Sequence, residues 1–183
     1  IRREDLPAVR EKELETVLQM YGAQPPKFFN YIDGEVSCAP AHQLTDDVYM
    51  IMHKVKPDIV VTFGPTGISH HKDHIAIHTA TLKAFRLYIK HTNKDARLFY
   101  VAIPESLAIQ MSLNLHEAEM DPTVIVDIHL QKNWKIQGLR TYRSQQDAQE
   151  LADMFESDEF SFECFHQAYP PSQESKIAYC FWG

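Results

Sequence analysis

The sequence is poor in several features that would each point to a particular class of protein. It has three cysteines and six glycines in 183 residues, and its net charge is -7 with histidines neutral. The cysteines, Cys38, Cys164 and Cys180, form neither a CxxC pair nor a disulfide framework, so we expect buried free thiols and a cytoplasmic protein. The acidic balance argues against a nucleic-acid-binding surface. No apolar run approaches the ~20 residues that span a bilayer, so we expect no stable membrane insertion.

What the sequence does contain is typical of a globular α/β domain. Hydrophobic residues make up 44% and charged residues 23%, and the length suffices for one domain with a core, so we predict a single domain over residues 1–183. Predicted strands alternate with predicted helices, which indicates a mostly parallel, doubly wound sheet. The expected strands cover residues 27–32, 58–63, 97–103, 123–128 and 177–182. The expected helices cover residues 5–21, 42–56, 75–90, 104–113 and 130–143, with a further acidic helix to residue 155.

A glycine-broken, histidine-rich loop lies between one predicted strand and the following helix. It runs from Gly64 to His74 and places three histidines and an aspartate within residues 70–74. Ligands of α/β proteins bind outside the carboxyl ends of the strands, which is where this loop lies. His71, Asp73 and His74 are titratable and able to bind metal, so the loop is a candidate catalytic or metal site. Composition alone leaves a solvated loop as the alternative.

The helix after this loop carries a further histidine. His74 and His78 are four residues apart and could share a helix face, as in HxxxH metal pairs. However, His78 also falls on the apolar stripe of the helix, which favours a packed, hydrogen-bonded core histidine. Asp73 lies near the helix N-terminus, where the helix dipole favours a carboxylate.

The order of motifs along the chain resembles the zinc-dependent de-N-acetylases of the LmbE-like or PIG-L type, whose fold is Rossmann-like. His70-His-Lys-Asp-His74 is similar to the second metal motif of that family, Gly-His-Pro-Asp-His. Arg10-Glu-Lys-Glu13 resembles its RxxE helix, and Tyr31-Ile-Asp-Gly34 its strand that ends in Asp-Gly. Asp127, Lys135 and the segment Tyr142-Arg-Ser-Gln145 are similar to its D…K…HRSQ region.

The resemblance implies a role for each matching residue. It implies that His74 is a Zn²⁺ ligand, that His71 is a charged donor or acid near the tetrahedral intermediate, and that Asp73 orients His71. It also implies that Arg10 and Asp33 face the substrate sugar.

The match also has departures. Lys72 replaces a proline, Ser69 stands where some members have a tyrosine, and Tyr142 replaces a histidine. The His-Pro-Asp-Asp motif, which in the family supplies two metal ligands and the general base, is absent from residues 1–183. We therefore expect this motif to lie before Ile1 in a longer protein.

The function that the resemblance implies is zinc-dependent removal of the acetyl group from an N-acetylglucosamine-type sugar or glycoconjugate. Its partner would be a small-molecule N-acetyl sugar conjugate, and several relatives form homo-oligomers. Two alternatives remain at this point. One is another metal-dependent hydrolase or a nucleotide-binding α/β protein, although the sequence has neither a GxGxxG nor a P-loop lysine-serine pair. The other is an inactive relative that acts in binding or assembly.

Overall fold

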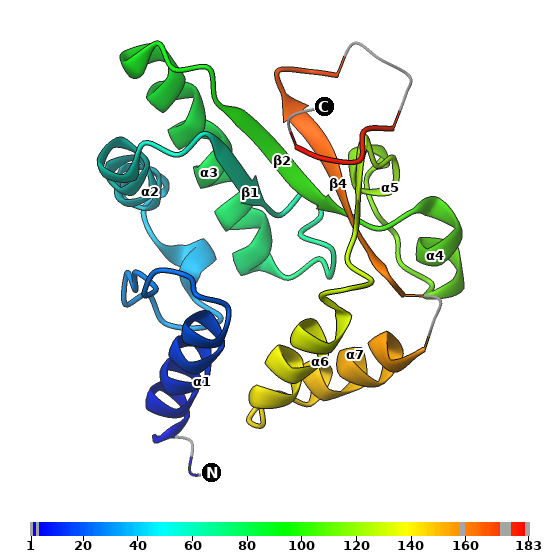
Figure 1. Cartoon of the computed structure of the whole chain (residues 1–183). Helices are drawn as coiled ribbons and strands as arrows, with labels where there is room; N and C mark the ends of the chain where they lie inside the picture. Colours follow the sequence, from blue (N-terminus) through cyan, green and yellow to red (C-terminus); the bar gives the residue numbers. More distant parts are fainter. Residues whose placement is uncertain (1, 3, 158–159, 173–176, 182–183) are drawn as a thin grey trace. The chain divides into compact units, whose positions relative to one another are not determined.

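A computed structural model describes residues 2, 4–157, 160–172 and 177–181 of the chain (Figure 1). These residues fall into two compact units, each made of two separate stretches of sequence. The first, here called the helical unit, comprises residues 1–28 and 127–162. The second, the sheet unit, comprises residues 29–126 and 163–183.

The sheet unit contains a four-stranded sheet in the order β1-β2-β4-β3. Strands β1 (Ile59–Thr62) and β2 (Arg97–Ala102) are parallel, whereas β2 and β4 (Phe162–Tyr169) are antiparallel, and β3 (Val124–Asp127) lies beside β4. Pairing of β2 with β4 runs from Leu98 opposite Tyr169 to Ala102 opposite Cys164. The predicted α/β fold is confirmed, and the structure adds an antiparallel pair to the sheet.

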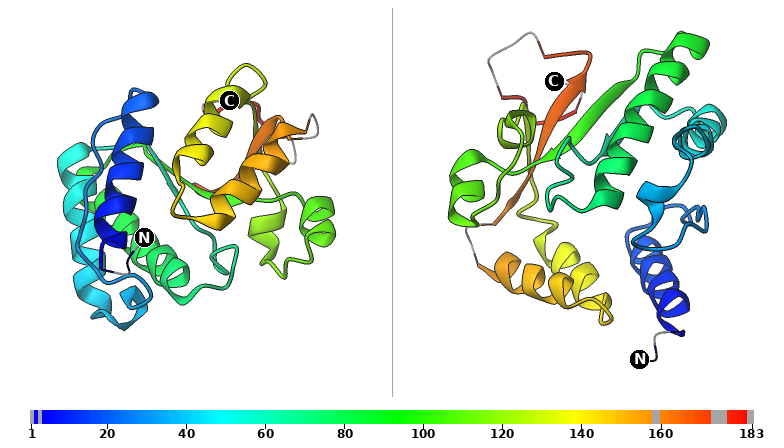
Figure 2. Two further views of the ribbon diagram at one scale, coloured as in Figure 1. Left: turned by 90° about the horizontal axis from the view of Figure 1, so that it is seen from below. Right: turned by 180° about the vertical axis from the view of Figure 1, so that it is seen from behind.

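Helices α2 (Ala41–Val55) and α3 (Lys72–Thr92) pack on each other, and α3 packs on β1 (Figure 2). Each helix ends at a residue in the left-handed conformation, Lys56 at φ 54° and Asn93 at φ 52°. Pro57 follows the first of these and cannot extend the helix. The core of the sheet unit lies between these helices and β2 and consists of Met52, Ala84, Phe85, Tyr88, Ala96, Leu98 and Tyr100.

Two short helices, α4 (Glu105–Gln110) and α5 (Glu117–Met120), separate β2 from β3, and the 3₁₀ helix η1 (Val36–Cys38) precedes α2. The sequence predicted α4 but not α5. At the start of α5, His116 and Glu119 form a capping box: the His116 Nδ1 accepts from the Ala118 N–H at 3.2 Å, and the Glu119 carboxylate accepts from the His116 N–H at 3.2 Å.

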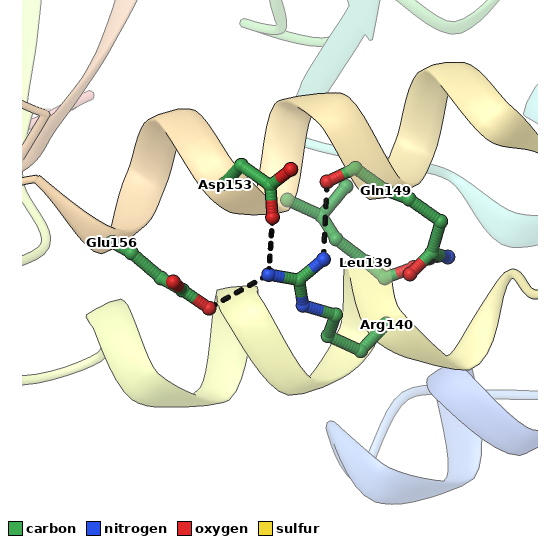
Figure 3. Close-up of polar contacts among 5 residues, drawn as sticks. All are labelled: Leu139, Arg140, Gln149, Asp153 and Glu156. Carbon is green, nitrogen blue, oxygen red and sulfur yellow. Dashed lines mark hydrogen bonds and ion pairs between the residues drawn. The ribbon is translucent and has the colours of Figure 1, made fainter.

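The helical unit consists of α1 (Leu6–Met20), α6 (Lys132–Thr141) and α7 (Gln146–Glu156). Helices α6 and α7 lie side by side as a hairpin that Arg140 holds together (Figure 3). The Arg140 guanidinium donates to Asp153 at 2.5 Å, to Glu156 at 2.7 Å and to the Gln149 carbonyl at 3.2 Å. Glu156 and Asp153 thereby raise the pKa of Arg140, since both favour its charged form.

Two expectations about strands were wrong. Residues 27–32 are described and form no strand. Pro25 and Pro26 lack backbone N–H groups, and Asn30 adopts a left-handed φ of 59° that interrupts an extended chain. In the C-terminal region, the strand is β4 rather than residues 177–182, of which Ala178 makes one parallel bridge to Val124 and Trp182 lies outside the described residues.

The expectation of buried thiols holds for one cysteine. All three cysteines are free, but Cys38 and Cys180 are exposed and only Cys164, on β4, is buried. Burial raises the pKa of the Cys164 thiol to about 11, which favours the unreactive protonated form. Among the described helices, none is long and apolar enough to cross a membrane.

Candidate active site

The histidine-rich loop lies where the sequence predicted it, between β1 and α3. The helix starts three residues earlier than expected, at Lys72, so Asp73 and His74 belong to its first turn. His71 is the N-cap residue, and its Nδ1 accepts a hydrogen bond of 3.3 Å from the Asp73 backbone N–H. A neutral His71 ring in this arrangement carries its proton on Nε2.

His74 has a fixed orientation. Its ring stacks on Phe63 with a centroid distance of 4.1 Å and an interplanar angle of 6°. Its Nδ1 lies 3.0 Å from the Gly67 carbonyl oxygen and 3.3 Å from Ser69 Oγ. Because a carbonyl can only accept, Nδ1 donates to it and the lone pair of the neutral ring lies on Nε2. Metal-ligating histidines are typically oriented by such a hydrogen bond from the other ring nitrogen.

The rings of His71 and His74 lie close together. Their ring centroids are 5.2 Å apart. By contrast, His78 is a core residue. It is 9% exposed, its Nδ1 is 2.9 Å from the Phe63 carbonyl, and its ring packs on Tyr100. The interpretation of His78 as a hydrogen-bonded core histidine is confirmed.

The backbone of the loop is strained. Gly67, Ile68 and His70 all have left-handed φ values, of 63°, 63° and 57°. For a β-branched residue such as Ile68 this conformation is a genuine outlier, and such strain costs about 1–3 kcal/mol per residue. Gly67 is crowded as well as left-handed, because an added Cβ would lie 2.5 Å from the Cβ of His74. Strain of this kind persists only where surrounding contacts fix the chain.

Glu119, which the sequence analysis missed, supplies many of these contacts. Its side chain is fully buried and accepts bonds from Thr66 Oγ1 at 2.6 Å, from the Thr66 N–H at 3.1 Å and from the Ile68 N–H at 3.3 Å. It lies so near Gly64 that an added Cβ there would be 2.2 Å from its Cγ. The only local signal in the sequence is the capping-box spacing from His116 to Glu119, which points to a helix start and not to the loop.

Asp73 joins the loop to the segment that contains Asp33. Its buried carboxylate accepts from the Gly34 N–H at 2.7 Å and the Ser37 N–H at 3.2 Å. Burial alone would raise the pKa of Asp73, but hydrogen bonds from the backbone at Ser37 and Gly34 outweigh it, and the pKa lies below its usual value. Asp73 is therefore a carboxylate that tethers Gly34, the neighbour of Asp33, to the start of α3.

In the helical unit, the structure brings together two of the predicted motif segments. Glu13 of α1 is 9% exposed and accepts from the Ser144 N–H at 2.9 Å and Ser144 Oγ at 2.6 Å. The RxxE segment and the Tyr142–Gln145 segment are thus neighbours within one unit. Arg10 lies one helical turn before Glu13 on α1, whereas Asp33, His71, Asp73 and His74 belong to the sheet unit.

Across residues 2, 4–157, 160–172 and 177–181, no group of three or more His, Cys, Asp or Glu side chains is placed to hold a metal ion. His74 has the geometry of one ligand, with Nδ1 engaged and Nε2 as donor atom.

Comparisons with known proteins agree with the motifs. Residues 1–85 match the family model described as PIG-L: GlcNAc-PI de-N-acetylase. A relative from Bacillus subtilis strain 168, named probable N-acetyl-alpha-D-glucosaminyl L-malate deacetylase 2, is 29% identical over 143 residues. That match includes 78% of this chain but 60% of the relative, so the chain spans about three-fifths of the relative's length.

Two solved structures share the fold. The conserved protein TT1542 from Thermus thermophilus superposes with a TM-score of 0.67 at 17% identity, covering 92% of this chain and 76% of its own. GalB from Pseudomonas putida KT2440, a 4-carboxy-2-hydroxymuconate hydratase, superposes with a TM-score of 0.68 at 13% identity, covering 95% and 77%. At these identities the likeness concerns the fold alone, and one fold supports unrelated reactions.

Proposed function

We propose that this chain, which resembles the PIG-L de-N-acetylases, is part of a metal-dependent hydrolase. This enzyme removes the acetyl group from an N-acetylglucosamine conjugate. The observation that carries this proposal is the orientation of His74. Its Nδ1 faces the Gly67 carbonyl at 3.0 Å, which presents Nε2 as a ligand beside the ring of His71. In a solvated loop, the two histidine rings would not be fixed by packing and by hydrogen bonds to the backbone.

The metal in this proposal is Zn²⁺. Nε2 of His74 would hold it, together with ligands from the His-Pro-Asp-Asp motif that the resemblance places outside residues 1–183. When bound, Zn²⁺ lowers the pKa of a coordinated water to about 7 and polarises the acetamide carbonyl. The carboxylate that takes the proton from that water would also come from His-Pro-Asp-Asp.

His71 is the proton donor in this proposal. Its Nδ1 is occupied by the Asp73 backbone N–H, so the reactive proton is on Nε2. From there the neutral ring can donate a hydrogen bond to the oxyanion that forms as the acetamide carbon becomes tetrahedral. Transfer of a proton to the leaving amine requires the imidazolium form, in which Nδ1 also carries a proton and no longer accepts from the Asp73 N–H. The backbone amide of Asp73 fixes the His71 ring, while its carboxylate holds Gly34, the neighbour of Asp33.

Substrate recognition in this proposal rests on Asp33 and Arg10. Asp73 stands next to His74 in the chain, and its carboxylate accepts from the Gly34 N–H. Asp73 therefore also positions Asp33, the residue before Gly34. A carboxylate accepts hydrogen bonds from sugar hydroxyls, and a guanidinium donates them. The small sugar conjugate as partner, the homo-oligomer and the cytoplasmic location stay predictions.

The experiment uses His74→Ala and His71→Ala in the full-length protein, with His53→Ala on the exposed end of α2 as a matched control. We expect His74→Ala to lose most bound zinc by elemental analysis. We expect His71→Ala to keep its zinc but to release acetate from N-acetylglucosaminyl malate at least ~100-fold more slowly, the usual scale of acid–base loss. Unchanged zinc in His74→Ala would refute the ligand assignment.

The wild-type protein separates the alternatives in the same assay. Zinc binding with acetate release supports the deacetylase. Zinc binding without acetate release supports a different metal-dependent hydrolase. A protein that neither binds zinc nor releases acetate would support a relative that acts in binding or assembly.

A further inference from the structure

Glu119 is the most deeply buried charged side chain among those described, at 0% exposure. Burying a carboxylate is costly unless hydrogen bonds replace its water. Its partners are concentrated on one short stretch of chain. Besides the His116 N–H at 3.2 Å, the carboxylate accepts only from Thr66 and Ile68 in the described contacts.

The two loop residues that Glu119 holds lie on either side of Gly67. The Gly67 carbonyl in turn accepts from Nδ1 of His74. Glu119 is therefore two hydrogen-bonding steps from the ring that presents Nε2. The same bonds hold Ile68 in its left-handed conformation, which the residue would otherwise leave.

We propose that Glu119 is a positioning residue of the active site, which fixes the Gly67 carbonyl and through it the orientation of His74. This inference rests on the proposed function for its catalytic consequence, but its structural part concerns the loop alone. Capping α5 would require only the bond from the His116 N–H. The contacts to Thr66 and Ile68 exceed what that helix needs.

The first test is Glu119→Gln, which keeps the size of the side chain but turns one of its acceptor oxygens into a donor. The matched control is Glu117→Gln, an exposed residue on the same short helix. Amide hydrogen exchange of the metal-free protein reports on the loop directly. We expect exchange to speed up by at least about tenfold at residues 66–70 in Glu119→Gln and not in the control, because a strained loop opens more often once its anchors are lost.

Two further measurements on the same variant separate positioning from general destabilisation. Competition with a chromophoric chelator should show zinc affinity weakened by about 10–100-fold, the usual cost of losing a group that orients a metal ligand. The kcat for acetate release should fall on a similar scale while KM stays within about twofold, because Glu119 touches no substrate.

If Glu119→Gln does not fold, the pair Thr66→Val and Thr66→Ser takes its place. The first removes the 2.6 Å bond to Glu119 and the second restores a hydroxyl, so zinc affinity should be weakened in Thr66→Val and recovered in Thr66→Ser.

Loop exchange unchanged from wild type would overturn the proposal, and so would zinc affinity within twofold of wild type in a protein that binds zinc. If wild type neither binds zinc nor releases acetate, the proposed function fails, and loop exchange alone then decides the role of Glu119.

Discussion

Two buried glutamates each hold the turn that precedes a helix, one in each unit. Glu119 holds the histidine-rich loop before α3, and Glu13 holds Ser144 before α7. The turn at Ser144 is unstrained, since its neighbours Tyr142 and Gln145 have φ values of -76° and -126°. The loop before α3 contains left-handed Ile68 and His70. Glu119 thus holds the strained loop at two residues, whereas Glu13 holds the relaxed turn at one.

The largest expected effect tests how crowded the loop is. Gly67→Ala should lower the free energy of unfolding by about 3 kcal/mol, because it adds left-handed strain to a contact of 2.5 Å with His74. Gly22 in the helical unit is the matched control. It has a similar φ of 69° with nothing near an added Cβ, so Gly22→Ala should cost only about 1 kcal/mol. Urea denaturation measures both, and equal costs would show that the loop is not crowded.

A smaller effect is expected at the relaxed turn. Glu13→Gln should lower the free energy of unfolding by about 2 kcal/mol, because a buried charged acceptor of two bonds becomes a neutral amide. Glu15→Gln, on the exposed face of the same helix, should change it by less than about 0.5 kcal/mol. Combining Glu13→Gln with Ser144→Ala should cost less than the sum of the two, and strict additivity would contradict the contact.

The smallest effect concerns a single side-chain bond, made by Tyr31 just before the turn at Asp33 and Gly34. Tyr31 donates to Asp47 at 2.7 Å, and this hydrogen bond, with lesser effects of burial and the Asp47 charge, raises the pKa of Tyr31 to about 12. A raised pKa favours the protonated form in the folded state. The contribution is therefore complete below pH 10 and is lost as the pH rises towards 12.

The test is Tyr31→Phe, which should cost about 1 kcal/mol at pH 7 because the bond is partly exposed. The difference from wild type should shrink above pH 11. Subtracting the 295 nm absorbance titration of the variant from that of wild type should show one phenol that titrates near pH 12. A phenol that titrates near pH 10 would contradict the bond to Asp47.

The parts of the site that sequence could predict are those with local signals. The glycines and histidines between an apolar run and an amphipathic helix placed the loop correctly, and the apolar spacing identified His78 as a core residue. Glu119 was missed because its contacts to Thr66 cross more of the chain than any sequence pattern covers. The strand at residues 27–32 was wrong because side-chain composition says nothing of a left-handed Asn30.

Strand β4 has a consequence for how the chain reaches this structure. It pairs with β2 through partners as distant in sequence as Leu98 and Tyr169, and α6 and α7 lie between these two strands in the chain. During synthesis, one edge of β2 therefore stays unpaired until the whole α6–α7 hairpin has left the ribosome. Contacts between residues so far apart in the sequence slow folding. An unpaired strand edge that contains Phe99 and Tyr100 is also a template for intermolecular pairing. We expect the nascent chain to be most prone to aggregation in this interval.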